Sequence, residues 1–78
     1  ELHLIGERVR PALERLEKFL DQQALDSRET VRIVHGHGTG ALRRAVQEQL
    51  TISPHVDHFT EAPPAQGGTG ATIVYLRG

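Results

Sequence analysis

The feature that most constrains this chain is a strand-like run that passes through a glycine-rich turn into a helix-like run, between residues 31 and 46. The run Val31-Arg-Ile-Val34 is rich in β-branched residues, which is typical of a buried strand. After the turn, residues of one stripe repeat at helical spacing: Leu42, Ala45, Val46, Gln49 and Leu50. The order strand, turn, helix predicts an α/β unit with the glycines at its tip.

The turn itself, His35-Gly-His-Gly-Thr-Gly40, predicts an anion site. Glycines at positions 36, 38 and 40 permit positive φ angles and leave no side chains over the backbone amides. A phosphate could therefore bind to N–H groups at the N-terminus of the following helix. Thr39 is expected to be the N-cap of that helix. We expect Gly36, Gly38, Thr39 and Gly40 to form the binding surface.

Basic residues concentrate around this turn, although the formal net charge of the chain is only −1. The stretch 30–47 contains no acidic residue, but it contains Arg32, His35, His37, Arg43 and Arg44. This balance is typical of a folded domain with one positive face and not of a polybasic arm. At about 100° per residue, Arg44 lies opposite the apolar stripe and Arg43 at its border. Arg43 and Arg44 are both candidate nucleic-acid contacts. Arg43 is the better placed for a phosphate and Arg44 should face solvent, and the alternative is that both are ordinary solvated residues.

Length and composition bound the remaining possibilities. Seventy-eight residues correspond to a single domain, and the absence of cysteine excludes disulfides and thiolate metal sites. No apolar run approaches the ~20 residues that span a bilayer, and no signal peptide is present. A cytoplasmic location without membrane partners is expected. Because the sequence begins at Glu1 and contains no methionine, we expect residues 1–78 to be a single domain cut from a longer protein.

The pattern along the chain predicts the order βαβαββ. Strands are expected over 1–6, 30–35, 56–60 and 71–76, and helices from about 8 to 25 and from about 40 to 50. Residues 61–70 are expected to form an irregular loop, either a mobile flap or a simple hairpin connection. This order predicts an α/β two-layer sandwich, with a four-stranded mixed sheet and both helices on one face. If the first three strands are parallel, Gly6, the glycine turn and the 61–70 loop share one edge, where such sheets bind ligands.

The segment His35-Gly-His-Gly-Thr-Gly-Ala-Leu-Arg43 resembles the HGxGTGxLR signature of the Smr (small MutS-related) domain. Three outer segments also fall into register with the family's motifs: 2–6, 53–56 and 67–74. The resemblance covers essentially the whole chain and is closest to the Smr domain at the C-terminus of MutS-like ATPases that act outside mismatch repair. It implies a fold similar to that of the C-terminal domain of translation initiation factor three.

The resemblance also implies a function on nucleic acids. Smr domains are associated with nicking of DNA, preferentially branched recombination intermediates, and in other members with RNA cleavage or stalled ribosomes. A DNA-nicking endonuclease domain is therefore the leading hypothesis, with DNA and the rest of the parent ATPase chain as partners. The alternative is a non-catalytic module that docks DNA, RNA or the ribosome.

The first motif of the family departs from its usual form in this chain. His3 stands where the family usually has aspartate, and Ile5 where it has histidine or arginine. Ile5 can neither transfer a proton nor hold a phosphate. A cleavage mechanism that depends on these two side chains therefore does not carry over to this sequence.

Three histidines are the candidate catalytic residues. His35 could act as a general base, donate to a phosphate oxygen, or only order the turn by bonding to backbone. His37, at the tip of the turn, is expected to contact phosphate, and His3 could form a substitute catalytic pair with His35. A divalent metal shared by His35 and His37 is an alternative that needs a third ligand from His3 or the 61–70 loop. Glu61 is the nearest carboxylate that could activate a water molecule.

A dinucleotide ligand is a competing hypothesis, because Gly36-x-Gly38-x-x-Ala41 fits the Rossmann fingerprint and Asp57 follows it. The fingerprint normally opens the first strand–helix unit of a much longer fold, whereas here it opens the second. No lysine follows the glycines, as a Walker motif would require. The sequence therefore favours a polynucleotide over a free nucleotide.

Overall fold

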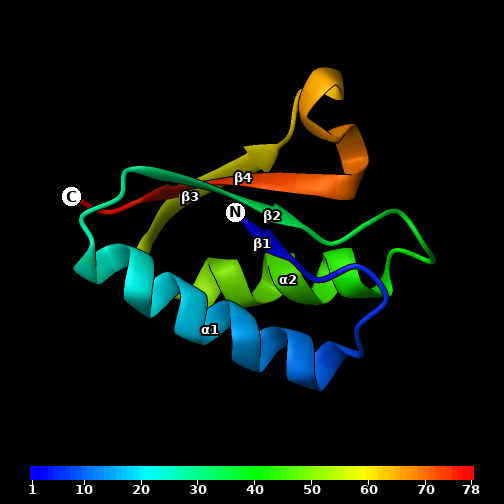
Figure 1. Ribbon diagram of the computed structural model, residues 1–78, viewed down its shortest axis with the longest axis horizontal. Coiled ribbons are helices and arrows are strands. Elements are labelled where there is room, and N and C mark those ends of the chain that lie inside the picture. Colours follow the sequence, from blue (N-terminus) through cyan, green and yellow to red (C-terminus); the bar gives the residue numbers. More distant parts are fainter.

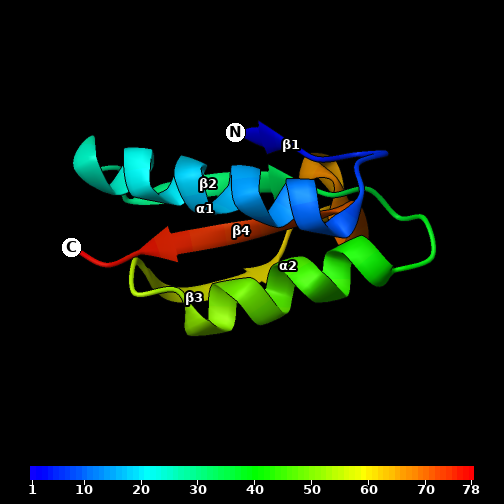
Figure 2. The ribbon, with the colours of Figure 1, turned by 90° about the horizontal axis from the view of Figure 1, so that it is seen from below.

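The computed structural model describes residues 1–78 and has the predicted two-layer α/β architecture. The elements follow in the order β1 (Leu2–His3), α1 (Val9–Leu25), β2 (Thr30–Val34), α2 (Ala41–Ile52), β3 (Val56–Glu61) and β4 (Ala71–Leu76). Two short 3-10 turns, η1 (Pro64–Gln66) and η2 (Gly68–Gly70), lie between β3 and β4. Figures 1 and 2 show both helices on one face of the sheet. The predicted order βαβαββ is confirmed.

The sheet is mixed, with the strand order β1-β2-β4-β3. β1 pairs in parallel with β2, and β4 pairs antiparallel with both β2 and β3. The first three strands therefore run in one direction, and β4 is inserted between β2 and β3. Five of the six residues of β4 are buried. β4 is the central strand, its inner face packs against the helices, and on its outer face Ala71 and Ile73 form a small cluster with Ala62.

The main core lies between the sheet and the helices. α1 contributes Ala12, Leu16 and Leu20, which are four residues apart and buried on one stripe, and α2 contributes Val46 and Leu50. They pack against alternate residues of the strands in one cluster that includes Leu4, Ile33 and Val74. This packing holds α1 and α2 side by side in the same direction, so that both N-termini lie at one end of the molecule (Figure 2).

Two segments differ from the prediction. β1 is limited to Leu2 and His3 because the chain leaves the sheet after Leu4, and Ile5 is 63% exposed beside Gly6, whose φ is +80°. The expected irregular loop is an ordered hairpin connection: Glu61 still belongs to β3, and residues 62–70 fold into η1 and η2. The Gly68 N–H donates to the Pro63 carbonyl across these turns (3.0 Å). None of the helices has the length and apolar character needed to cross a membrane.

Candidate nucleic-acid interface

A cleft of about 350 Å³ opens between the loop after β1 and the glycine turn after β2. We call it the glycine-turn cleft, and its lining is formed by residues 6–9 and 35–43. The sequence predicts that Gly6 and the glycine turn meet at the carboxyl edge of the sheet, and this is confirmed. The 61–70 connection does not line the cleft, but it supports the turn from behind through Gly70.

Backbone amides are the main polar groups that the glycine turn presents. Gly36, Gly38 and Gly40 all have positive φ angles, of +81°, +42° and +86°. Five N–H groups of the turn and the first turn of α2 donate to no backbone or side-chain acceptor: those of His37, Gly38, Thr39, Leu42 and Arg43. Such unpaired N–H groups at a helix N-terminus are a ready site for an anion.

Gly40, and not Thr39, is the N-cap of α2, so the prediction for Thr39 is wrong in this respect. The left-handed backbone of Gly40 takes the cap position, which leaves Thr39 one residue outside the helix. The Thr39 hydroxyl oxygen still accepts a bond from the Ala41 N–H (3.3 Å). Thr39 therefore satisfies one of the free amides but leaves those of Leu42 and Arg43 open.

The N-terminus of α1 faces the same cleft. Its N-cap is Arg8, the N-cap residue of neither helix makes a side-chain capping bond, and neither first turn contains an acidic residue. The positive ends of two helix dipoles, each equivalent to roughly half a unit charge, therefore face one space. The single carboxylate in the lining, Glu7, is paired with Arg15. The cleft is thus electropositive in its backbone as well as in its side chains.

The two arginines of α2 lie as the helical spacing predicts. Arg43 lines the cleft, whereas Arg44 is exposed and lies outside it. The Arg43 side chain is 40% exposed, and its Nη2 is 3.7 Å from the Glu61 Oε1 at the end of β3. Glu61 is therefore directed at Arg43 and does not line the cleft. A carboxylate that activates a water molecule would have to lie in the cleft, so this position does not support that role for Glu61. An exposed pair of this kind is weak, so Arg43 remains available to a phosphate.

His35 is buried beneath the turn, with only 4% of its surface exposed. Its Nδ1 is 3.0 Å from the Gly36 carbonyl oxygen, and its Nε2 is 2.9 Å from the Thr72 Oγ1. Burial lowers the pKa of His35 below its ordinary value of 6.5. The bond to the Gly36 carbonyl raises the pKa by less than burial lowers it, and the nearby charges of Arg43 and His37 lower it further. His35 is therefore neutral at pH 7 and both ring nitrogens are occupied. Of the three roles predicted for it, this geometry favours ordering of the turn.

His37 differs from His35 in being exposed, and its ring makes no hydrogen bond. The ring lies against Gly70, where an added Cβ would come within 2.8 Å of the His37 Cε1. The Gly70 carbonyl also accepts from the N–H groups of His35 and Gly36, at 3.1 and 2.9 Å. Gly70 is thus part of the site, although it lies in a loop far along the chain and no turn signal in the sequence indicates this role.

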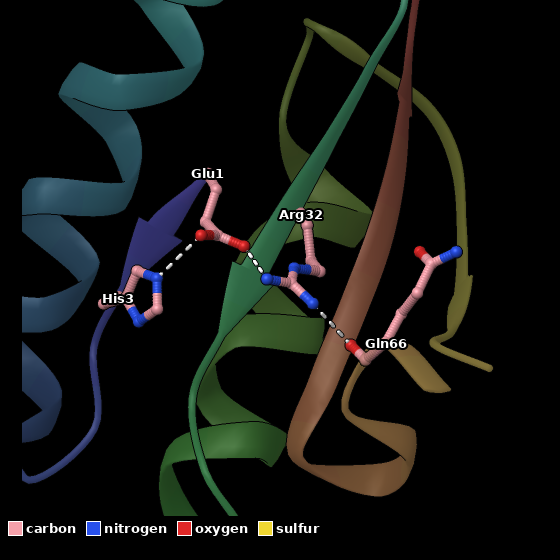
Figure 3. A network of polar contacts seen from close by, with 4 residues as sticks. All are labelled: Glu1, His3, Arg32 and Gln66. Atoms are coloured by element: carbon pink, nitrogen blue, oxygen red, sulfur yellow. Dashed lines mark hydrogen bonds and ion pairs between the residues drawn. The ribbon is translucent and has the colours of Figure 1, made fainter. Parts of the chain in front are cut away.

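His3 lies on the face of the sheet that points away from the helices, as Figure 3 shows. It stands opposite Val34 in the register, and its Nε2 is 2.9 Å from the Glu1 Oε1. The second carboxylate oxygen of Glu1 pairs with Arg32, whose Nη1 donates to the Gln66 carbonyl (2.9 Å). The prediction of a catalytic pair of His3 and His35 is therefore wrong: His3 shares the face of its partner Val34, and His35, the next residue, points to the opposite face.

The alternatives based on a metal or a dinucleotide gain no support from this arrangement. No three His, Asp or Glu side chains are grouped so that they could hold a metal ion, and His3 is not within reach as a third ligand. Asp57, the acidic residue of the dinucleotide pattern, pairs with His58 on β3 and does not line the cleft.

The fold and the cleft define a class: a small α/β domain that directs two helix N-termini at one cleft lined by unpaired N–H groups. The family model of the Smr domain matches residues 2–77, and the chain belongs to this family.

Relatives and solved structures agree with this assignment. The chain is 49% identical over 77 residues to Endonuclease MutS2 of Lactobacillus johnsonii, which covers 99% of the chain but 10% of that protein. It is 40% identical to the Smr domain of Thermus thermophilus MutS2, with a TM-score of 0.96 and coverage of 99% of this chain and 96% of the other. For YdaL, a stand-alone small MutS-related protein of Escherichia coli, the identity is 30%, the TM-score 0.94 and the coverage 99% and 63%. The chain thus spans about a tenth of the length of the curated MutS2 relatives.

Proposed function

We propose that this domain binds the sugar-phosphate backbone of DNA in the glycine-turn cleft, as the nucleic-acid-binding module of a longer MutS2-like chain. The observation that carries the proposal is the set of unpaired N–H groups at the N-terminus of α2, opposite the uncapped N-terminus of α1. These donors recognise phosphate oxygens without regard to base sequence. Arg43 and Arg8, which both line the cleft, add the charge that a polyanion requires.

Nicking of DNA, preferentially at branched intermediates, is a second candidate. It is favoured by the name Endonuclease MutS2 that the curated relatives carry. Of the three candidate histidines, His37 alone presents an unoccupied ring at the cleft, so we assign it the contact with the scissile phosphate. With both ring nitrogens of His35 hydrogen-bonded and His3 on the opposite face of the sheet, a proton-transfer pair is not assembled from these histidines. Binding therefore ranks above cleavage, and RNA or ribosome docking is the corresponding non-catalytic alternative.

The adjacent arginines of α2 provide a matched test of the binding site. Fluorescence anisotropy with labelled four-way junctions, duplex DNA and duplex RNA would be measured over a range of salt concentrations. We expect Arg43→Ala to weaken binding and to lower the log–log salt slope by roughly 0.9, the value for one phosphate contact. Arg44→Ala should leave the slope unchanged, since Arg44 lies outside the cleft. Equal effects of the two variants, or an affinity independent of salt, would refute the proposed site.

A separate assay tests cleavage. Highly purified domain would be incubated with supercoiled plasmid and with four-way junctions, with Mg²⁺ or with EDTA. Nicking that is lost in His37→Ala while DNA binding persists would establish the second candidate. Binding without nicking under all conditions would leave the domain as a docking module.

A further inference from the structure

Thr72, on the central strand β4, is a buried polar residue at a place where an apolar one would be expected. It lies on the face of the sheet that packs against the helices, with Ile33 opposite it and Val74 two residues further along the strand. None of its surface is exposed. A hydroxyl in such surroundings is costly unless it is hydrogen-bonded, and the partner of Thr72 is the Nε2 of His35, at 2.9 Å.

The direction of the two bonds to His35 follows from their chemistry. The Gly36 carbonyl can only accept, so the hydrogen of the neutral imidazole must be on Nδ1. Nε2 is then an acceptor, and the Thr72 hydroxyl must donate to it. The chain of bonds runs from the Thr72 hydroxyl through the His35 ring to the carbonyl of Gly36, which is the first left-handed residue of the glycine turn.

We propose that Thr72 is a positioning residue for the glycine-turn cleft: its hydroxyl donates to Nε2 and so fixes the orientation of the His35 ring, and His35 in turn fixes the backbone of Gly36. The proposal rests on the proposed function, because it concerns the same amides that are to bind phosphate. It also assigns His35 to the support of the site, since its ring nitrogens point to Thr72 and Gly36 and not to a ligand. Thr72 itself does not line the cleft, so its effect on binding passes through His35.

Anchoring from β4 explains why the turn needs support of this kind. The residues of the turn have few backbone bonds of their own: Gly40 N–H donates to the His37 carbonyl, and the N–H groups of His35 and Gly36 both donate to Gly70. The other side of the Gly36 peptide is held by the His35 ring. Gly70, which directly precedes β4, and Thr72 within β4 thus hold the beginning of the turn at Gly36, the first through the Gly36 N–H and the second through His35 and the Gly36 carbonyl.

The test compares Thr72→Val, which keeps the shape without the hydroxyl, with Thr72→Ser, which keeps the hydroxyl without the methyl group. Long-range ¹H–¹⁵N correlation spectra of the imidazole report the tautomer of His35 and, through the ¹⁵Nε2 shift, whether this nitrogen accepts a hydrogen bond. Hydrogen exchange at the bonded amides of Gly36 and Gly40 reports the opening of the turn. In the wild-type domain we expect one tautomer, with hydrogen on Nδ1. Thr72→Ser should retain it and bind DNA within about twofold of the wild type.

Thr72→Val should keep hydrogen on Nδ1, since the Gly36 carbonyl still requires it, but should move the ¹⁵Nε2 shift to that of a free acceptor. It should also speed exchange at the bonded amides of Gly36 and Gly40 by at least about fivefold, the effect of one unsatisfied buried acceptor. DNA affinity should fall by a similar factor, while exchange in α1 remains unchanged. The proposal is overturned if Thr72→Val keeps the ¹⁵Nε2 shift of the wild type and the slow exchange at Gly36 and Gly40, or if Thr72→Ser is as impaired as Thr72→Val. The spectra need no nucleic acid, so a failure of DNA binding in the wild type would refute the proposed function and not the role of Thr72.

Discussion

Gly70→Ala separates the position of the His37 ring from the stability of the domain. The φ angle of Gly70 is not in the left-handed region, so alanine is compatible with the backbone. The added Cβ would lie 2.8 Å from the His37 Cε1 and 3.1 Å from its Nδ1. Ordinary contact begins at 3.4 Å, so the ring must move by at least the difference of 3.4 and 2.8, which is 0.6 Å. His37 is exposed and can make this movement.

The expected cost in stability is small, whereas the expected cost in binding is not. Displacement of an exposed ring, offset by the lower backbone entropy of alanine in the unfolded chain, should change the free energy of unfolding by less than about 1 kcal/mol. If the His37 ring donates to a phosphate, loss of that bond removes about 0.5–1.5 kcal/mol. This corresponds to a twofold to tenfold weaker affinity for DNA.

The assay combines urea denaturation with anisotropy binding for Gly70→Ala, His37→Ala and the double variant. We expect the two single variants to weaken binding equally, and the double variant to be no worse than either, because both remove one contact. An unchanged affinity in Gly70→Ala together with a weakened one in His37→Ala would show that the ring position is irrelevant. A loss of more than about 3 kcal/mol of stability in Gly70→Ala would show that the ring is not free to move.

Three further results are expected. Gly40→Ala should destabilise the domain by about 1–2 kcal/mol in urea denaturation, because the φ angle of Gly40 is +86° and an added Cβ would contact no other atom. Gly40→Asn should lower the free energy of unfolding by less, because asparagine tolerates this backbone better. Equal losses in the two variants would show that backbone strain is not the cause. The pKa of His35 is lowered in the folded domain. Between this lowered pKa and 6.5, the unfolded chain therefore binds a proton that the folded domain does not. Thermal stability should therefore be full above pH 6.5 and fall as the pH drops through this window, and this step should be absent in His35→Asn. Leu16→Ala should cost about 2–5 kcal/mol, since Leu16 is fully buried in α1, whereas Lys18→Ala on the exposed side should change the unfolding midpoint little.

Local patterns were sufficient for most elements of the fold. The β-branched runs predict β2 and β4, and the apolar stripe of α1 predicts a helix that the structure has at Val9–Leu25. The length of β1 was overestimated because Ile5 looks like a strand residue, whereas its side chain is exposed where the chain turns at Gly6. Propensity cannot detect this, since the competing turn is decided by tertiary contacts.

The position of β4 in the sheet was within reach of the sequence but was not predicted. Its run Ala71-Thr-Ile-Val-Tyr-Leu76 lacks the alternation of a half-exposed strand, which indicates burial on both faces and hence a central place. The faces of the candidate histidines could have been predicted in the same way. His35 is two residues from Ile33 and shares its inward face, whereas His3 lies between two buried leucines and must point outward.

The contacts of Gly70 and Thr72 with the turn were beyond such patterns, because they join residues more than thirty positions apart through the pairing of β2 with β4. That pairing depends on which strand enters the centre of the sheet, and periodicity does not specify a partner.

The location of the cleft follows from the topology more than from the sequence of any one loop. β1, β2 and β3 are parallel, so each helix that connects them must begin at the carboxyl edge of the sheet and end at the opposite edge. Two helices that pack side by side in the same direction bring their unpaired N–H groups to one end. Acidic side chains at these ends would cancel the field, and neither first turn contains one. The glycine turn then adds its free amides where two dipoles already favour an anion, which explains why a domain with a net charge of −1 can present a site for a polyanion.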